Sequence, residues 1–349
     1  MRYRALAISS LAVALGVSAG WMVPANASNT APAEVLVAAT PPVVPDDAPL
    51  ADTTALQSIA DANGGLRAHG RPGFKASMDF LKGKLDGAGL TTSLQTFTYN
   101  GATGYNLIAE WPYGDANNVI MSGAHVDSVN AGAGINDNGS GTAAVLETAL
   151  AVAKQNLRPD KRMRFGFWGA EELGLVGSKN YVQSLPAAER SKINVYLNFD
   201  MVGTKNIKAW GIYQEGPDVA AQFTKFFTGR GLATKPIDPA GRSDHGSFAR
   251  YGIKVTGISS ESDLNHLEPC YHQACDTRNN VDAKNMALAA NSIVTVMWNL
   301  AGAKVIANAP TGTPTPTSSP TGPAPQSSTP APAPSPTSTR RPRPPWWPW

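Results

Sequence analysis

The sequence predicts a three-layer α/β/α sandwich built on a mixed sheet with a parallel centre. Short apolar runs of strand length alternate along the chain with segments that suit helices, and this alternation is typical of a sheet covered by helices. Three of the apolar runs, at 118–122, 163–168 and 193–199, lead into His, Glu or Asp residues. Open α/β sheets bind ligands outside the carboxyl ends of their strands, so these polar groups are expected to converge there.

The N-terminal residues have the pattern of an export signal. Arg2 and Arg4 precede an apolar stretch from Ala5 to about Val17, and Ala25-Asn26-Ala27 fits a small-residue cleavage site. Residues 1–27 are therefore interpreted as a signal peptide, and the mature protein is expected to be secreted.

The remaining ends of the chain differ in composition from folded protein. Residues 28–45, rich in Ala, Pro and Val, are interpreted as a pro-segment or disordered lead-in, and the Pro-, Thr- and Ser-rich residues 309–349 as a disordered tail. A tether to a cell-surface polymer stays open for the basic, Trp-rich residues 340–349. A folded domain is expected over residues 46–308.

The composition excludes some classes of function. The chain has 349 residues, of which 42% are hydrophobic and 16% charged, which is enough apolar material for a sizeable core. Its net charge of +3, with no basic stripe between aromatic residues, argues against nucleic-acid binding. Beyond the signal peptide, no segment has the roughly 18 continuous apolar residues of a membrane span.

The first predicted elements are two helices and a hairpin. Asp52 is expected to cap a helix that ends near Ala60, and a second helix is expected over 75–85. Two strand-like runs, 91–99 and 105–111, are separated by Asn100-Gly101, which predicts a hairpin at one side of the sheet.

The later elements complete the alternating pattern. Residues 142–154 are predicted to form a crossover helix, and the Gly- and Asn-rich loop before it, 134–141, carries Asp137. The last helix is expected over 283–300.

The two cysteines, Cys270 and Cys275, are expected to pair rather than stay free thiols, because an exported protein meets an oxidising compartment. The bridge would enclose Tyr271 and His272 and hold them in place.

Glu171 and Glu172 stand side by side at the end of a buried strand, where each carboxylate raises the cost of ionising the other. A divalent cation would remove that cost by binding one acid and leaving its neighbour free to handle protons. This pair of acids therefore predicts a metal site, which needs further ligands from elsewhere in the chain.

The strand ends and loops supply five candidate ligands of mixed imidazole and carboxylate type, which suits zinc better than magnesium or calcium. They are His125, Asp137, Glu172, Asp200 and His272. If Asp137 bridges, each of two metals receives three protein contacts. The two sets are His125, Asp137 and Asp200, and Asp137, Glu172 and His272. Three ligands and a shared water are typical of an open, catalytic site, and Glu171 is then the general base.

Each assignment is weak when it is taken alone. A histidine after a strand is more often a loop residue, a single Asp in a Gly- and Asn-rich loop is usually a turn former, and the cysteine segment could be only a stapled loop. The hypothesis depends on their joint occurrence at strand ends.

Six motifs together resemble the M28 family of dizinc aminopeptidases, most of all the secreted leucine-type aminopeptidases of Streptomyces. They are His125-Val-Asp127, Gly134-Ile-Asn-Asp137-Asn-Gly-Ser-Gly141, Gly169-Ala-Glu171-Glu172-Leu-Gly, Asn198-Phe-Asp200-Met-Val-Gly, Arg242-Ser-Asp-His245 and Tyr271-His272. The resemblance covers about residues 48–303 and implies the zinc-dependent exopeptidase fold. It also implies the ligand set above, with two zinc ions per chain and Glu171 as proton shuttle.

The resemblance further implies roles for residues beside the ligands. Asp127 would orient His125, as carboxylates do for metal-bound imidazoles. Tyr271 would polarise the scissile carbonyl or stabilise the oxyanion, and Arg242 would contact substrate near its amine and carbonyl. The Asp137–Asn138 peptide bond is expected to be cis.

Calcium is possible, since some relatives carry a site between acids near the N-terminus and the last helix. Asp46 and Asp47 would serve at one end, but Ala287, Ala290 and Asn291 offer no acid at the other. The last helix therefore does not support a calcium site.

The leading hypothesis is a secreted, monomeric metallo-aminopeptidase that acts on peptides with a free N-terminus and not on membranes or nucleic acid. A metal-bridging hydroxide would be the nucleophile, Glu171 the general base and acid, and Glu171 and Asp200 would hold the α-amine. A preference for large hydrophobic N-terminal residues such as Leu is implied by the resemblance.

Four rival functions differ in the features that they need. A dizinc carboxypeptidase or deacylase needs a basic pocket, for which Arg242 is the nearby candidate. A one-metal cyclase relative and a degenerate, non-enzymatic binding module would lack part of the ligand set. A serine hydrolase needs a Gly-x-Ser-x-Gly elbow, and none follows a strand.

Overall fold

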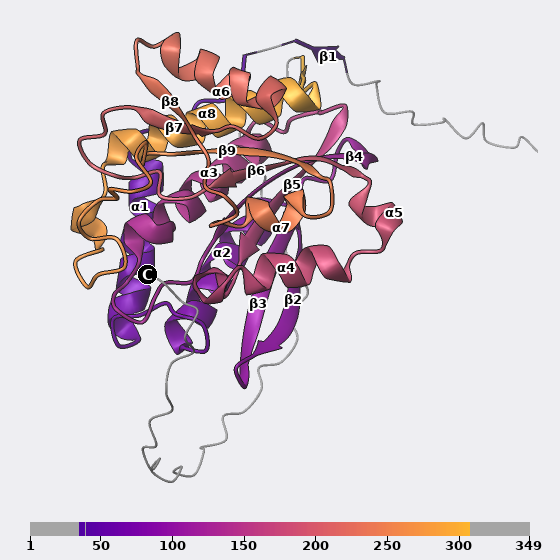
Figure 1. Ribbon diagram of the computed structural model, residues 1–349. Helices are drawn as coiled ribbons and strands as arrows, with labels where there is room; N and C mark the ends of the chain where they lie inside the picture. The colour runs from indigo at the N-terminus through magenta and orange to yellow at the C-terminus, as the bar shows by residue number, and fades with distance from the viewer. Residues whose placement is uncertain (1–34, 39, 308–349) are drawn as a thin grey trace, which may run out of the picture. The chain divides into compact units, whose positions relative to one another are not determined.

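The computed structural model describes residues 35–38 and 40–307, and within them eight strands form one sheet in the order β2-β3-β5-β4-β6-β9-β7-β8 (Figure 1). The strands of this sheet are β2 Thr91–Tyr99, β3 Ala102–Glu110, β4 Asp115–His125, β5 Lys161–Trp168, β6 Ile193–Phe199, β7 Trp210–Tyr213, β8 Thr234–Ile237 and β9 Lys254–Ser259. The helices are α1 Ala48–Ala62, α2 Pro72–Gly87, α3 Gly141–Lys154, α4 Val176–Ser184, α5 Ala187–Arg190, α6 Pro217–Thr228, α7 His245–Ala249 and α8 Ala283–Ala301. Short helical turns are η1 Ile135–Ser140, η2 Glu171–Leu173 and η3 Arg278–Asn280.

The centre of the sheet is parallel and its flanks are not. β5, β4, β6 and β9 run in one direction, whereas β3 is antiparallel to β5 and β7 is antiparallel to β9. The carboxyl ends of the four central strands therefore meet at one edge of the sheet. The predicted site residues at strand ends lie at this edge.

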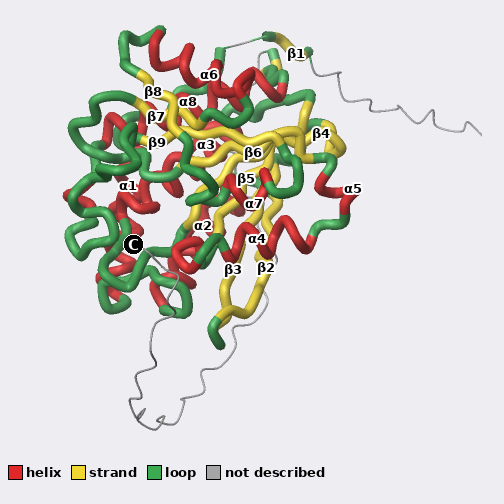
Figure 2. Tube along the Cα trace, viewed as in Figure 1, coloured by secondary structure: helices red, strands yellow, loops and turns green. Residues whose placement is uncertain are grey.

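Helices cover both faces of the sheet (Figures 1 and 2). α1, α2, α3, α6 and α8 pack against one another and the first face, while α4 and α7 contact each other over the second. These layers confirm the predicted three-layer sandwich with its mixed, centrally parallel sheet.

Alternate side chains of the central strands fill the two layers between sheet and helices, as the period of a strand requires. On β4, Ile120 belongs to the large cluster under α3 and α8, while Met121 belongs to the cluster under α4 and α7. On β6, Val195 and Tyr196 divide in the same way. The strands that carry the site are thus buried on both faces and held rigidly.

The N-terminal hairpin is confirmed, because β2 and β3 pair in register from Thr91 with Glu110 to Tyr99 with Ala102 at one side of the sheet. The expected cap of the first helix is wrong. α1 begins at Ala48 with Pro49 in its first turn, and Asp52 lies inside the helix, buried, where it accepts a hydrogen bond from Lys84.

Folded structure begins before the expected boundary at residue 46. β1 Leu36–Val37 pairs with β10 Val305–Ile306, and Val44 is buried in the core. The amide of Asn291 on α8 accepts from the Val44 N–H and donates to its carbonyl, both at 2.9 Å. Asn291 is one of the residues considered for a calcium site on the last helix, and its side chain is instead hydrogen-bonded to the backbone of Val44.

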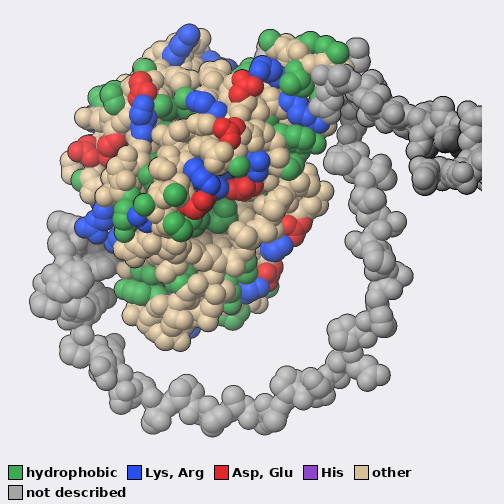
Figure 3. Space-filling view, turned by 90° about the vertical axis from the view of Figure 1, so that its right-hand side faces the viewer, with side chains coloured by type: hydrophobic (Ala, Val, Ile, Leu, Met, Phe, Trp, Pro, Cys, Tyr) green, Lys and Arg blue, Asp and Glu red, His purple; other side chains and the backbone are tan. Residues whose placement is uncertain are grey.

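The predicted signal peptide (1–27) and tail (309–349) lie outside the described residues. Within the described part, no helix is long and apolar enough to cross a membrane. On the face drawn in Figure 3, Lys and Arg side chains are interspersed with Asp and Glu.

Candidate metal centre

Three neighbouring strands deliver polar side chains to the same edge of the sheet. His125 is the last residue of β4, Glu171 and Glu172 lie in the turn after β5, and Asp200 follows β6 directly. Because β5, β4 and β6 are adjacent and parallel, their carboxyl ends bring these residues together, as the sequence predicts.

The other two candidate ligands come from loops. Asp137 lies in η1 between β4 and α3, and the peptide between Asp137 and Asn138 is cis, as expected. His272 lies inside the predicted disulfide, which is formed between Cys270 and Cys275 with their Cα atoms 5.3 Å apart.

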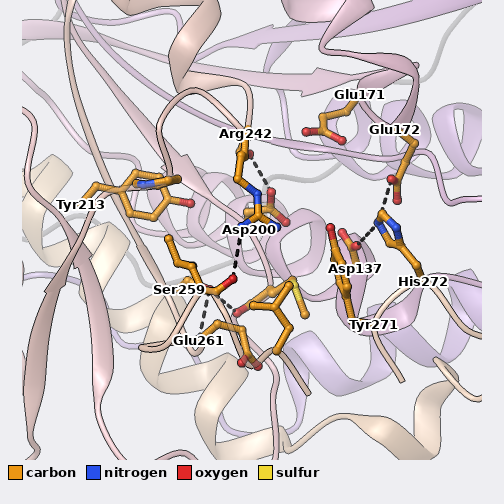
Figure 4. Close-up of a pocket in the computed structure, with 15 residues that line it drawn as sticks. Asp137, Glu171, Glu172, Asp200, Tyr213, Arg242, Ser259, Glu261, Tyr271 and His272 are labelled. Atoms are coloured by element: carbon orange, nitrogen blue, oxygen red, sulfur yellow. Dashed lines mark hydrogen bonds and ion pairs between the residues drawn. The ribbon is translucent and has the colours of Figure 1, made fainter. Parts of the chain in front are cut away.

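The five residues form two groups that share Asp137. Figure 4 shows Asp137 between Asp200 on one side and His272 with Glu172 on the other. Asp137 Oδ1 lies 3.3 Å from His125 Nε2, which is also 3.4 Å from Asp200 Oδ1. The second Asp137 oxygen, Oδ2, lies 3.1 Å from His272 Nε2, which is 3.0 Å from Glu172 Oε2. Within each group, the possible ligand atoms lie within 4.8 Å of one another.

The carboxylates attract positive charge to the space between them. Burial and the charge of Asp137 raise the pKa of Glu172 to about 8. Burial by itself would lower the pKa of His272, but hydrogen bonds to Asp137 and Glu172 raise it to about 10. His125 behaves in the same way, with the charges of Glu171 and Asp200 raising its pKa well above the ordinary value.

The residues fit a pair of divalent cations. Glu172 Oε1 and Asp200 Oδ1 are buried and accept no hydrogen bond from any described residue. A buried carboxylate oxygen without a donor is costly unless a cation binds it. Because each group combines imidazole and carboxylate donors, the chemistry suits zinc or a neighbouring transition metal.

Asp127 supports both the histidine and the two glutamates. His125 Nδ1 contacts the backbone carbonyl of Asp127 at 3.1 Å, while the nearest carboxylate oxygen is 3.7 Å away. That carboxylate accepts from the N–H groups of Glu171, at 3.0 Å, and Glu172, at 3.4 Å. Asp127 therefore lies beside His125, as the resemblance implies, and in addition fixes the turn that carries the acids.

A hydrogen-bonded chain behind Asp200 fixes its second oxygen. Ser243 Oγ donates to Asp200 Oδ2 at 2.6 Å and accepts from the Asn198 amide at 2.8 Å. Tyr196 in turn donates to Asn198 at 3.0 Å. The chain leaves Asp200 Oδ1 facing His125.

Asp276, which sequence reasoning missed, holds the loop that carries the shared acid. Its two buried oxygens accept from the backbone N–H groups of Asn136, at 2.7 Å, and Asp137, at 2.9 Å. Its position just after Cys275 was the one local signal for this contact.

Arg67, also missed, is a fully buried cation behind the site. Its guanidinium donates to the carbonyls of Val126, Ala133 and Gly134, in the loop between His125 and Asp137. Burial lowers the pKa of Arg67 to about 10, and the nearby acids oppose that shift. Arg67 therefore joins the loop that separates two candidate ligands to the α1–α2 connection.

A pocket opens next to the two groups. Tyr271, Arg242 and Glu171 line it together with four of the five candidate ligands, Asp137, Glu172, Asp200 and His272. Tyr271 stacks on His272 with ring centroids 3.8 Å apart, and Arg242 Nη1 donates to the Leu264 carbonyl at 3.2 Å. The structure thus brings every predicted site residue to one place, with the candidate base beside the ligands.

Comparison with known proteins agrees with this geometry. A family model described as Peptidase family M28 matches residues 106–297, more than half of the chain. Leupeptin-inactivating enzyme 1 of Streptomyces exfoliatus is 49% identical over 296 residues, which are 80% of this chain and 67% of that protein. Leucine aminopeptidase 2 of Arthroderma otae is 42% identical over 178 residues, 48% of this chain and 35% of the relative.

Among solved structures, the zinc aminopeptidase BSAP of Bacillus subtilis is similar with a TM-score of 0.53 and 29% identity, over 62% of this chain and 54% of that one. The findings confirm the resemblance seen in the motifs and the prediction of a peptidase. This chain belongs to peptidase family M28.

Proposed function

We propose that this chain is a secreted, monomeric aminopeptidase that holds two zinc ions and removes the N-terminal residue of peptides. The observation that supports it most is the pair of three-residue groups that share Asp137. The names of its relatives, which include aminopeptidases of bacteria and fungi, support the same activity.

His125, Asp137 and Asp200 would hold one ion, and Asp137, Glu172 and His272 the other. A bound pair of zinc ions lowers the pKa of a water molecule and stabilises negative charge on the carbonyl oxygen under attack. Asp127, Ser243 and Asp276 keep the ligands in position through the hydrogen bonds described above.

Glu171 is the proposed proton carrier. It belongs to neither ligand group, yet its Oε2 lies 3.9 Å from His125 Nε2 and it lines the pocket. A carboxylate at this place takes the proton from the attacking water and gives it to the leaving amine.

Glu171, Asp200 and Tyr271 would contact the N-terminal end of the peptide. Glu171 and Asp200 are acids at the pocket wall that suit a positively charged α-amine. Tyr271, whose phenol keeps its proton at neutral pH, would donate to the oxyanion that forms from the scissile carbonyl.

The pocket also supports a preference for large apolar N-terminal residues. Met201, Leu264 and Leu267 form part of its wall. Leucine aminopeptidases among the relatives agree with this preference.

The test compares L-leucine p-nitroanilide with its N-acetylated form, together with a metal count per chain. We expect rapid release of nitroaniline from the free amine, at least about 100-fold slower release from the blocked one, and two zinc ions per chain, since the blocked amine loses its charge-assisted hydrogen bonds. Equal cleavage of the two substrates would contradict the aminopeptidase function, because the enzyme would then not recognise a free α-amine.

Substitution of Asp276 by asparagine is expected to weaken zinc binding about 10- to 100-fold, the usual effect of losing a residue that positions a ligand. The amide offers one acceptor oxygen where the carboxylate offers two, so one of the N–H groups of Asn136 and Asp137 loses its partner. Competition with a chromophoric chelator measures the affinity.

Asp282 gives the matched control, because its carboxylate also accepts a backbone N–H, that of Asn285 at 2.9 Å, at the start of α8. Asp282→Asn should keep wild-type zinc affinity. An Asp276→Asn protein that binds zinc as tightly as the wild type would contradict the positioning role.

A further inference from the structure

The pocket has an acid on the side away from the metal groups. Figure 4 shows Ser259 and Glu261 across the pocket from Glu171 and Glu172. Ser259 is the last residue of β9, and Glu261 follows two residues later. Neither residue has a part in the proposed catalytic machinery.

Glu261 is buried, with 7% of its surface exposed, and its carboxylate has hydrogen-bond donors but no paired cation in the described structure. Oε1 accepts from Thr204 Oγ1 at 2.5 Å. The backbone of Glu268 also donates to this carboxylate. Among the described residues, no Lys or Arg forms an ion pair with it. Burial raises the pKa of Glu261, as it does for a carboxylate without a cation beside it.

The position of Glu261 is fixed on both sides. Its backbone N–H donates to Ser259 Oγ at 3.1 Å. Thr204, which donates to the carboxylate, itself accepts from the Asn136 amide at 2.9 Å. A side chain held in this way keeps its carboxylate in one place at the pocket wall.

Arg242 is the cation that lines the same pocket, and it does not neutralise Glu261. Its guanidinium donates to the Leu264 carbonyl, and it forms no ion pair with Glu261 in the described structure. Glu268 acts in both directions: its negative charge raises the pKa of Glu261, while the hydrogen bond from its backbone lowers it.

These features match an N-terminal side chain that is apolar along its length and positively charged at its end. Leu264, Leu267 and Met201 offer apolar wall for the methylene groups of lysine or arginine. The charged end would meet the unpaired carboxylate of Glu261 at the pocket wall and form a charge-assisted hydrogen bond shielded from water.

We propose that Glu261 is a specificity-determining residue that extends the enzyme's range to peptides with N-terminal lysine or arginine. The inference rests on the proposed aminopeptidase function, whose pocket it divides into an apolar wall and an acidic end. Leucine would use the wall alone.

The test compares kcat/KM for the p-nitroanilides of lysine and norleucine, which have the same four-carbon chain with and without the ammonium group. We expect the wild type to cleave both, and Glu261→Gln to lower the lysine-to-norleucine ratio at least about tenfold, the effect of losing one hydrogen bond between charged groups. The glutamine can still accept from Thr204, so the loop keeps its support. Because the readout is a ratio, a general loss of activity does not affect it.

Asp263→Asn is the matched control, since Asp263 is an exposed acid in the same loop that does not line the pocket. Its ratio should equal that of the wild type. An unchanged ratio in Glu261→Gln, an equal fall in the control, or a wild type that cleaves norleucine but not lysine would overturn the inference alone. A wild type that cleaves neither substrate would overturn the aminopeptidase function itself.

Discussion

Replacing Glu171 by glutamine is expected to lower kcat for a leucine amide by about 100- to 10,000-fold, the range that a general acid and base contributes. The glutamine has nearly the same shape, so it fills the same space beside His125 but cannot carry a proton. Since Glu171 belongs to neither ligand group, the variant should keep its zinc. Steady-state kinetics give kcat, and a zinc count on the same preparation shows whether the metal is kept.

Glu172→Gln provides the contrast, because it changes the neighbouring residue in the same turn. Glu172 belongs to the group with Asp137 and His272, so this variant is expected to lose zinc as well as activity. If Glu171→Gln kept more than about a tenth of wild-type kcat, another group would have to move the proton, and the proposed division between base and ligand would be wrong.

Replacing Arg67 by methionine is expected to destabilise the fold by about 3–5 kcal/mol, the usual result of removing one partner from a buried ionic cluster. Methionine has similar length but no donors. The carbonyls of Val126, Ala133 and Gly134 would lose their partner, and the charge that opposes Asp276 and Asp127 would be gone. Urea unfolding at constant pH measures the free energy of unfolding.

Arg71 is the matched control, as it lies on the same α1–α2 connection but is exposed, with one long hydrogen bond of 3.4 Å to Asn130. Arg71→Met should change the free energy of unfolding by less than about 0.5 kcal/mol, as surface substitutions usually do. Similar values for the two variants would show that the buried guanidinium contributes no more than an exposed one.

The candidate site was predictable because its main residues stand at strand ends. A buried strand is recognised from a few apolar residues, and the polar residue that follows it must lie at the carboxyl edge of a parallel sheet. This local rule places His125, Glu172 and Asp200 together without any knowledge of the loops. This rule does not reach Asp137 and His272, whose loops have no period; they were candidates by residue type, and the resemblance to a family then supported them.

The segment between residues 204 and 259 was not predicted, for two physical reasons. β7 and β8 have four residues each, too few for an alternating pattern to stand out, and β8 contains Pro236. A signal for α6 is present, with Pro217 at its start and apolar residues at Val219 and Phe223. Because the short strands on either side of α6 were not recognised, the position of this helix in the fold could not be predicted.

Other contacts gave little or no local signal, because the partner residues lie far apart in the sequence. Arg67 bonds to carbonyls about 60 residues further along the chain, and Asp276 to N–H groups almost 140 residues earlier. Asp52 looked like a helix cap because Asp is common there, but its true partner is Lys84. A single sequence cannot reveal such pairs, because nothing in either residue specifies the other.

The order of the strands places most of the proposed metal ligands apart from the residues proposed to determine substrate specificity. Four of the five proposed ligands, His125, Asp137, Glu172 and Asp200, follow β4, β5 and β6 at the middle of the sheet. Arg242 follows β8, and Ser259, Glu261 and Leu264 lie at or just after the end of β9, towards one flank. His272 is the ligand that comes from that flanking segment, outside residues 259–267. Substitutions in this flanking segment can therefore change substrate specificity during evolution without changing the ligands at the middle of the sheet. The same can be done by protein engineering: exchanging residues 259–267 between family members should change substrate specificity while the proposed ligands stay the same.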